Sequence, residues 1–329
     1  MLVAIGGAQE SVYLEMYILE DDTHGFDFLS ELARKAASGV RVCVVLDRIG
    51  SFGLARAAIV RLRASGAEVL FFSYWWKRTH RKMLIVDEKQ VFLGGVNISG
   101  QFAPWRDLQL ELRSERIART MIASFALVYK DAGGVDPFVR ARARKLPLLR
   151  RARFWFIEHG IGTKRSVLLN YYIEHIGAAK ERICLVTPYF IPHRWFIALL
   201  HSALLRGVSV EIIIPNTTDF WIIDRVNRHF LSELHALGAT CYLAGTMNHA
   251  KAMLIDAKEG LVGSNNLDAL SFDWNIEAGI FFNDKHMTED LVHIMNEWRA
   301  EATRYEVSKE ARWYDFFIIL FLGMFRSVL

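Results

Sequence analysis

The chain has 329 residues, of which 52% are hydrophobic and 23% are charged. This is the composition of an ordinary globular protein, and it excludes a mainly disordered or fibrous chain. The length predicts about two domains, and a chain of this size can bury sizeable cores. The formal net charge of +4 is modest, and the positive charge is concentrated locally.

Strand and helix patterns alternate through the first half of the chain. Short apolar runs bounded by turn residues predict strands, and apolar residues at helical spacing predict helices. In chain order we expect strands at 12–17, 40–46, 68–72, 83–86 and 91–93, and helices at 26–37 and 54–64. This alternation is typical of an α/β layer.

The second half repeats this order. We expect strands at 183–187, 208–214, 240–243, 253–255 and 261–262, and helices at 195–205 and 220–237. The pair Gly39-Val40 recurs as Gly207-Val208, an offset of 168 residues, and four polar or glycine positions recur at an offset of 169. The sequence therefore predicts two copies of one α/β fold, each a mixed sheet flanked by helices.

Composition shifts suggest where these units begin and end. We assign residues 1–132 to the first unit, 133–164 to a basic connector, 165–305 to the second unit and 306–329 to an apolar tail. From Arg140 to Arg153 there are seven basic residues and no acidic one. Such a run is typical of a solvated connector or of a contact with a polyanionic surface, either phospholipid headgroups or nucleic acid. The neighbouring aromatics Trp155 and Phe156 favour a membrane.

The apolar run from Phe316 to Phe325 is the other candidate for membrane contact. Its ten residues would extend about 15 Å as a helix, half of a bilayer core of roughly 30 Å. We expect it to lie in the membrane interface or to pack as a core helix, and we expect no transmembrane span. Met1-Leu-Val-Ala-Ile5 lacks the basic start of a secretory signal.

Cysteine and histidine spacing bears on redox state and metals. Three cysteines, Cys43, Cys184 and Cys241, are too few for a disulfide framework, so we expect buried thiols in a reducing compartment. No cysteine pair or His/Cys cluster has the spacing of a zinc site. We therefore expect neither a metal nor a cofactor.

One motif, His-x-Lys-x4-Asp, occurs once in each half. His80, Lys82 and Asp87 form the first copy, and His249, Lys251 and Asp256 form the second. About 0.02 chance matches are expected from the composition, so two matches in repeat register are not accidental.

The spacing of the motif has a chemical meaning. His and Lys stand two residues apart at the start of a strand, so they project to the same face. A histidine can act as a nucleophile or as a general acid and base near neutral pH, and a lysine beside it offers positive charge to a phosphoryl oxygen. Downstream, Gly94-Gly-Val-Asn97 and Gly263-Ser-Asn-Asn266 follow short strands. Their glycines allow close approach, and Asn97, Ser264 and Asn266 can donate hydrogen bonds to the same anion.

With these motifs the chain resembles the phospholipase D superfamily, and within it the bacterial cardiolipin synthases. The family pattern continues with Gly-Ser-x-Asn and a Glu eleven residues after the Asn, which Gly263, Ser264, Asn266 and Glu277 match. The first half departs from it, because Gly95 replaces the Ser and the acidic residue is Asp107, ten residues after Asn97. Further similarity lies in residues 14–18 with 21–22, in 187–190 and in 267–268. Family members usually have a further helix and strand before the segment near Ile5, so the resemblance implies that this chain begins inside that helix.

The resemblance implies a transphosphatidylation in a cleft between the two halves. A phosphatidyl group passes from phosphatidylglycerol to an alcohol on a second lipid, through a covalent phosphohistidine. We expect His80 to be the nucleophile and His249 the acid and base, with Lys82, Lys251, Asn97 and Asn266 holding the phosphate oxygens. Glu277 is expected to orient a histidine, and Asp87 and Asp256 to support the strands. The expected setting is the cytoplasmic side of a bacterial membrane, with an anionic lipid surface and no nucleic acid as partner.

Three alternatives use the same residues differently. A phospholipase D hydrolase would use water as acceptor, and a nuclease of the superfamily would use the basic run on a phosphodiester backbone. Such nucleases commonly carry one motif per chain, whereas this chain carries both. A non-enzymatic membrane scaffold is compatible with the missing serine at Gly95, but the intact doubled motif argues against it.

Overall fold

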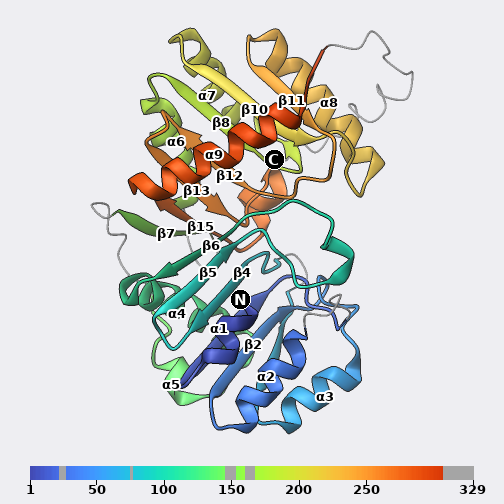
Figure 1. Ribbon diagram of the computed structural model, residues 1–329, viewed down its shortest axis with the longest axis vertical. Helices are drawn as coiled ribbons and strands as arrows, with labels where there is room; N and C mark the ends of the chain where they lie inside the picture. The colour runs from blue at the N-terminus through green and yellow to red at the C-terminus, as the bar shows by residue number, and fades with distance from the viewer. Residues whose placement is uncertain (22–26, 75–76, 145–152, 160–166, 307–329) are drawn as a thin grey trace.

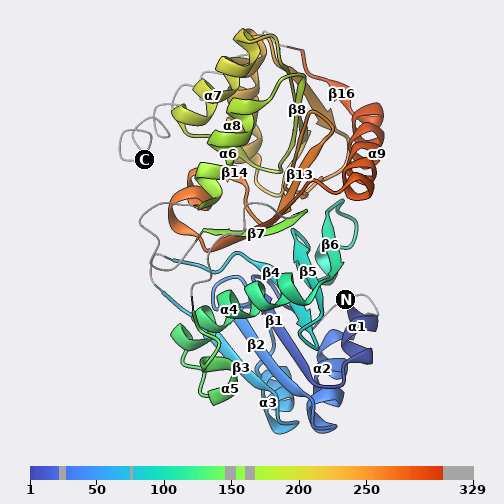
Figure 2. The same cartoon turned by 90° about the vertical axis from the view of Figure 1, so that its left-hand side faces the viewer.

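The computed structural model describes residues 1–21, 27–74, 77–144, 153–159 and 167–306. They form two α/β lobes stacked along the long axis of the molecule, with the first half of the chain below the second (Figure 1). Each lobe contains a mixed sheet with helices against it, as the turned view also shows (Figure 2). The predicted pair of repeated α/β lobes is therefore confirmed.

The first sheet has the strand order β3-β2-β1-β4-β5-β6. Its first three members in space are parallel, and β4, β5 and β6 continue as an antiparallel meander. The strands are β1 (Ser11–Met16), β2 (Arg41–Asp47), β3 (Glu68–Phe72), β4 (Lys82–Val86), β5 (Gln90–Gly94) and β6 (Gln109–Arg113).

The second sheet repeats this arrangement and extends it at both edges. Its order is β16-β11-β10-β8-β12-β13-β15-β7, with β8, β10 and β11 parallel. The strands are β7 (Phe154–His159), β8 (Arg182–Val186), β10 (Ser209–Pro215), β11 (Thr240–Ala244), β12 (Ala252–Ile255), β13 (Glu259–Gly263), β15 (Glu277–Phe282) and β16 (Thr303–Arg304). A small separate sheet joins β9 (Phe190–Ile191) to β14 (Leu267–Asp268).

Helices cover the outer face of each sheet. The first lobe uses α1 (Leu2–Gly7), α2 (Phe28–Ala37) and α3 (Arg56–Ala64), and the second uses α6 (Val167–Ala178), α7 (Arg194–Leu205) and α8 (Trp221–Ala236). Alternating side chains of the central strands explain this layering, since Val12 and Leu14 of β1 face the helices while Tyr13 faces the opposite side.

The inner faces of the two sheets share one continuous hydrophobic core. It contains side chains of α4 (Glu115–Asp131) and α9 (Lys285–Glu301) together with strand residues of both lobes. Burying apolar area from both lobes in one core stabilises their association. The two halves therefore form a single packed unit, and a site between them has rigid walls.

The segment 133–164, predicted to be a connector, contributes to both lobes. The short helix α5 (Pro137–Arg140) packs on α4, and β7 pairs with β15 in the second sheet. Phe156 is buried in the shared core, and the Trp155 ring stacks on Phe281 with centroids 4.1 Å apart. The reading of these two aromatics as a membrane contact is wrong, because strand pairing places both against protein.

Two arginines of the described part of the basic run lie beside acidic side chains. Arg142 pairs with Glu88 at 3.0 Å, and Arg153 lies 3.7 Å from Asp284. Residues 145–152 of the run and the apolar segment 316–325 lie outside the described residues. Within the described ranges, no helix is long and apolar enough to cross a bilayer.

All three cysteines are free and buried, as the sequence predicts. Burial raises the pKa of each thiol to about 12, so none is a reactive thiolate near neutral pH.

Candidate active site between the lobes

The two His-x-Lys pairs lie at the start of equivalent strands, β4 and β12. His80 and Lys82 are almost wholly buried, as are His249 and Lys251. Each lysine folds back on its own motif, since Lys82 Nζ donates to the His80 carbonyl at 2.6 Å and Lys251 Nζ to the His249 carbonyl at 2.5 Å. The structure thus brings each predicted His and Lys together.

Backbone hydrogen bonds between the lobes hold both histidines. The His80 N–H donates to the Ile276 carbonyl at 2.9 Å, and the Ile276 N–H donates to the Arg78 carbonyl at 2.7 Å. The same pattern recurs in the other direction, where the His249 N–H donates to the Arg106 carbonyl at 2.7 Å. Each histidine is therefore positioned by the lobe to which it does not belong.

These bridges place a carboxylate of the opposite lobe beside each imidazole. His80 Nδ1 lies 3.0 Å from Glu277 Oε1 and 3.1 Å from the Ser264 carbonyl. His249 Nδ1 lies 2.7 Å from Asp107 Oδ2. A proton on Nδ1 is favoured in both rings, because each Nδ1 faces acceptors, and the unprotonated Nε2 is left for chemistry.

Asp107 occupies in the first lobe the place that Glu277 occupies in the second, despite its different type and spacing. Ser264 Oγ donates to Glu277 Oε2 at 2.5 Å and fixes the longer side chain. At the equivalent Gly95 there is no side chain, and a Cβ there would lie 2.1 Å from Asp107 Oδ1. The absence of a side chain at residue 95 thus leaves room for the Asp107 carboxylate. His249 therefore keeps an acidic partner although the first half departs from the family pattern.

Burial and mutual repulsion set the charges of the site. Burial is the main cause that lowers the pKa of His80, and it lowers that of His249 well below the usual value, with Lys251 and Lys82 adding to the effect. Burial and the charge of Lys251 hold the pKa of Lys82 well below its ordinary range. Burial also lowers the pKa of Lys251 to about 8.

The two carboxyl groups respond differently to the same surroundings. Burial raises the pKa of Asp107 to about 6 although Lys251 opposes the rise. Burial acts on Glu277 in the same direction, but His80, Lys82 and the Ser264 hydroxyl outweigh it and hold its pKa below the usual value. Glu277 therefore stays negatively charged at lower pH than Asp107 does. Its charge favours the orientation of His80 more strongly than Asp107 favours that of His249.

The predicted asparagines follow β5 and β13 at equivalent positions of the two lobes. Oδ1 of Asn97 and Oδ1 of Asn266 are buried with no hydrogen-bond partner among the described residues. A buried amide oxygen without a partner is costly, so an equivalent pair of them in the two motif loops favours a ligand with polar atoms. Either end of the amide can meet that ligand, because rotation exchanges its oxygen and nitrogen.

The structure does not bring Asp87 and Asp256 to this space. Both follow the far ends of β4 and β12, in hairpin turns with left-handed backbone at φ 50° and 51°. Asp87 accepts backbone N–H bonds from residues 9–11, and Asp256 from residues 180–182. These two carboxylates anchor the starts of β1 and β8, as expected of residues that support the strands. Although both belong to the motif, they lie away from the histidines and are not counted among the catalytic residues.

Aromatic side chains that the motif did not reveal form the walls. The Tyr17 ring lies edge-on to His80 with centroids 4.6 Å apart, and Lys82 Nζ is 4.8 Å from the Tyr17 ring centroid. The ring centroids of Trp105 and Tyr189 lie 5.3 and 6.4 Å from the ring centroid of His249. The stretches around Tyr17 and Tyr189 resembled the cardiolipin synthases, and this was the one signal that pointed to them.

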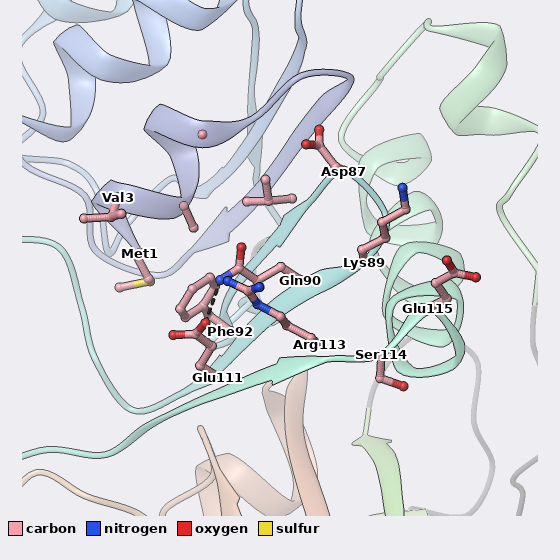
Figure 3. A pocket seen from close by; sticks show the side chains of 13 residues that line it. Met1, Val3, Asp87, Lys89, Gln90, Phe92, Glu111, Arg113, Ser114 and Glu115 are labelled. Carbon is pink, nitrogen blue, oxygen red and sulfur yellow. Dashed lines mark hydrogen bonds between the residues drawn. The ribbon is translucent and has the colours of Figure 1, made fainter.

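The described residues hold no metal cluster beside this site, and they form a hollow that lies away from it. No group of three His, Cys, Asp or Glu side chains there is arranged to hold a metal. A hollow of about 710 Å³ lies beside α1 and contains Met1, Asp87 and Arg113, but neither histidine (Figure 3).

Comparison with known proteins agrees with this geometry. The family described as "Cardiolipin synthase, PLD-like domain" matches residues 1–128 and 172–299, one copy in each lobe. The probable cardiolipin synthase YwiE of Bacillus subtilis is 30% identical over 92% of this chain, and cardiolipin synthase A of Pseudomonas putida is 29% identical over 90%. The chain spans 63% and 65% of the lengths of these two relatives.

Solved structures share the fold at lower sequence identity. A phosphatidylserine synthase of Haemophilus influenzae superposes with a TM-score of 0.76 at 15% identity, covering 99% of this chain and 90% of that one. A polyphosphate kinase of Porphyromonas gingivalis gives a TM-score of 0.64 at 16% identity, covering all of this chain and 51% of that one. Since the family match takes in most of the chain and both of its lobes, the chain belongs to the family of cardiolipin synthase, phospholipase D-like domains.

Proposed function

We propose that this protein transfers a phosphatidyl group from phosphatidylglycerol to the hydroxyl of a second lipid, as a phosphatidyltransferase of the cardiolipin synthase type. The observation that carries the proposal is the pair of buried His-Lys sets, each imidazole paired with a carboxylate of the other lobe. Two histidines in equivalent but chemically unequal settings suit a reaction with two displacements at phosphorus. The names of the relatives supply the substrate class.

In the first displacement, His80 Nε2 attacks the phosphorus of phosphatidylglycerol. An N–P bond forms, and the bond from phosphorus to the headgroup glycerol oxygen breaks. His249 donates from its Nε2 the proton that this oxygen needs; in the scheme His249 is protonated there when substrate is bound, because the phosphate supplies the negative charge that the empty site lacks. The Glu277 carboxylate stabilises the positive charge that develops on the His80 ring. Glycerol leaves, and the phosphatidyl group remains on His80.

In the second displacement, His249 removes the proton from an incoming lipid hydroxyl. The hydroxyl oxygen attacks phosphorus, the N–P bond breaks, and His80 returns to its neutral form. With a second phosphatidylglycerol as acceptor the product is cardiolipin, so two lipids yield one cardiolipin and one glycerol. His249 returns to its initial protonated state, and the cycle balances.

Lys82, Lys251, Asn97 and Asn266 hold the non-bridging phosphate oxygens in this scheme. Both lysines are buried, and contacts with phosphate are worth far more in such surroundings than in solution. A bound phosphate also returns the lysines toward their charged form, because it supplies the negative partner that the empty site lacks.

Incubation with phosphatidylglycerol vesicles, followed by mass spectrometry of the lipids, tests the proposal. Cardiolipin and glycerol in equal amounts are expected, and His80→Ala is the control that should give neither. Phosphatidic acid as the sole lipid product would instead support the hydrolase, with water as the acceptor. Absence of turnover by a folded chain would favour a non-catalytic role.

Attachment to an anionic bacterial membrane surface, on its cytoplasmic side, is part of the same proposal. The basic run of residues 140–153 would attract anionic lipid with about 1 kcal/mol per side chain near the surface. Co-sedimentation with phosphatidylglycerol vesicles at low and high salt tests this attraction. Binding that ignores both salt and lipid charge would contradict it.

A further inference from the structure

Six exposed large apolar side chains lie in, or directly after, loops that adjoin walls of the histidine site. We refer to them as the apolar rim, and they are Ile49, Phe52, Phe220, Trp221, Leu270 and Trp274. Phe52 is 88% exposed and Trp221 is 65% exposed. Single exposed aliphatic residues are ordinary, but a gathering of bulky aromatic ones marks an interaction surface.

In the first lobe, the rim residues adjoin the wall of the His80 side. Ile49 and Phe52 follow β2, with Gly50 between them packed so closely on Tyr17 that a Cβ there would lie 2.3 Å from the Tyr17 carbonyl oxygen. The Tyr17 ring in turn contacts His80. The loop therefore runs from the site wall directly to an exposed phenylalanine.

In the second lobe, the same relation recurs with unrelated residues. The Tyr189 ring lies beside His249, and its hydroxyl donates to Asp219 at 2.7 Å. Phe220 and Trp221 follow Asp219 immediately, at the start of α8. Trp274 precedes Asn275, whose side-chain amide donates to Glu277 at 3.4 Å, and Leu270 begins the same π-helical turn.

Outside the apolar rim, the partly exposed aromatic side chain of Phe138 is covered by other side chains. Its ring is covered by two guanidinium groups, with Arg41 at 4.0 Å and Arg142 at 3.5 Å from the ring centroid. The loops after β2 and β10 are equivalent in the two lobes, and both carry uncovered apolar side chains. The exposed apolar side chains of both lobes therefore adjoin walls of the same site, and a single broad partner can meet them together.

We propose that this partner is a phospholipid bilayer, and that the apolar rim enters the boundary between headgroups and acyl chains so that the site opens onto the membrane surface. The inference rests on the proposed function, because acyl chains stay in the bilayer while the phosphate must reach two buried histidines. Tryptophan and phenylalanine suit that boundary, since they bury apolar area there at headgroup depth.

The test compares a rim variant with a matched control in the full chain. The rim variant is Phe52→Ser, Trp221→Ser and Trp274→Ser together, and the control is Val60→Ser, Val135→Ser and Leu205→Ser, all exposed apolar positions outside the rim. Two readouts are taken: co-sedimentation with vesicles of phosphatidylglycerol and phosphatidylcholine at high salt, and turnover of those vesicles relative to monomeric dibutyroyl phosphatidylglycerol.

The rim variant should lose at least about tenfold in vesicle binding and in the vesicle-to-monomer turnover ratio, because three bulky apolar groups no longer leave water. The control should match the wild type. A rim variant that behaves as the control does in both readouts overturns the proposal.

A further measurement does not depend on the triple variant. The fluorescence of Trp221 is obtained as the difference in emission between the wild type and Trp221→Phe. Lipids brominated on their acyl chains should quench this fluorescence, and its persistence without quenching overturns the proposal. Failure of the proposed function has a different result. A wild type that turns over neither vesicles nor monomeric lipid refutes the activity, and the comparison of vesicle binding still tests whether the apolar rim contacts the membrane.

Discussion

Asp107 accepts the His249 Nδ1 hydrogen bond at 2.7 Å across the lobe boundary, in a space kept open by the absence of a side chain at Gly95. The other lobe reaches the same end with a longer acid, Glu277, held by the Ser264 hydroxyl. The two histidines thus have equivalent partners built from different residues. This explains how a chain can lack the serine of one motif and keep a complete pair of oriented imidazoles.

A side chain at residue 95 should therefore damage catalysis specifically. Gly95→Ala places its Cβ against the Asp107 carboxylate and pushes that group away from His249, and we expect turnover to fall by roughly a hundredfold, as misplacement of about 1 Å can cost. The fold should persist, which circular dichroism would verify. Gly177→Ala is the matched control, because a Cβ there meets nothing within 4 Å. Full activity of Gly95→Ala would remove Asp107 from the account.

The alkaline limb of the pH profile should report Lys251. Burial lowers its pKa to about 8, and only the charged form attracts phosphate, so kcat/KM should decline above about pH 8 rather than near 10. Lys251→Arg keeps its charge over this range and should move the limb to higher pH, even if its overall rate is lower. An alkaline limb at the same pH in both proteins would show that another group titrates.

Chelation should leave the chemistry intact. In the proposed scheme the positive charge at the phosphate comes from two buried lysines, and the described residues offer no cluster of His, Cys, Asp or Glu for a metal. Turnover of monomeric dibutyroyl phosphatidylglycerol should be unchanged in EDTA, and this substrate avoids effects of divalent ions on the vesicle surface. Loss of turnover on chelation, restored by a divalent ion, would contradict the scheme.

Arg81, between His80 and Lys82, should matter for stability. Its guanidinium is fully buried and makes two bonds to the Glu15 carboxylate, at 2.9 and 2.7 Å, and one to Ser124 at 2.5 Å. Arg81→Met leaves Glu15 buried without its charge partner, and the free energy of unfolding in urea should fall by about 3–5 kcal/mol.

Two further variants sharpen that prediction. Adding Glu15→Leu to Arg81→Met should recover much of the loss, because no isolated charge then remains buried. Arg34→Met, which breaks an exposed pair with Glu31, should leave the unfolding midpoint nearly unchanged. Equal effects of Arg81→Met and Arg34→Met would mean that the buried network contributes nothing special.

Local patterns predicted the lobes well, and they could not predict how the lobes meet. The run Met83–Val86 and the glycine after α2 are signals within a few residues, and β4 and β2 lie where they indicate. The pairing of His80 with Glu277 depends on contacts between residues nearly 200 positions apart, which no spacing rule contains. The spacing of Asp107 in the sequence does not identify it as the partner of His249, because the room that Gly95 leaves for its carboxylate exists only in the folded structure. The prediction of a membrane contact at Trp155 and Phe156 is wrong for the same reason, since their strand β7 pairs with β15, more than 100 residues later in the chain.

The division of labour between the two histidines is the central claim, and a phosphatidyl ester of p-nitrophenol tests it most directly. This leaving group departs without a proton, so His249→Ala should release about one equivalent of p-nitrophenolate in a burst and then stall, because nothing activates the acceptor. His80→Ala should show no burst, because nothing forms the N–P bond. A burst from His80→Ala and none from His249→Ala would reverse the assignment. Steady turnover by either folded variant would contradict the two-histidine mechanism itself.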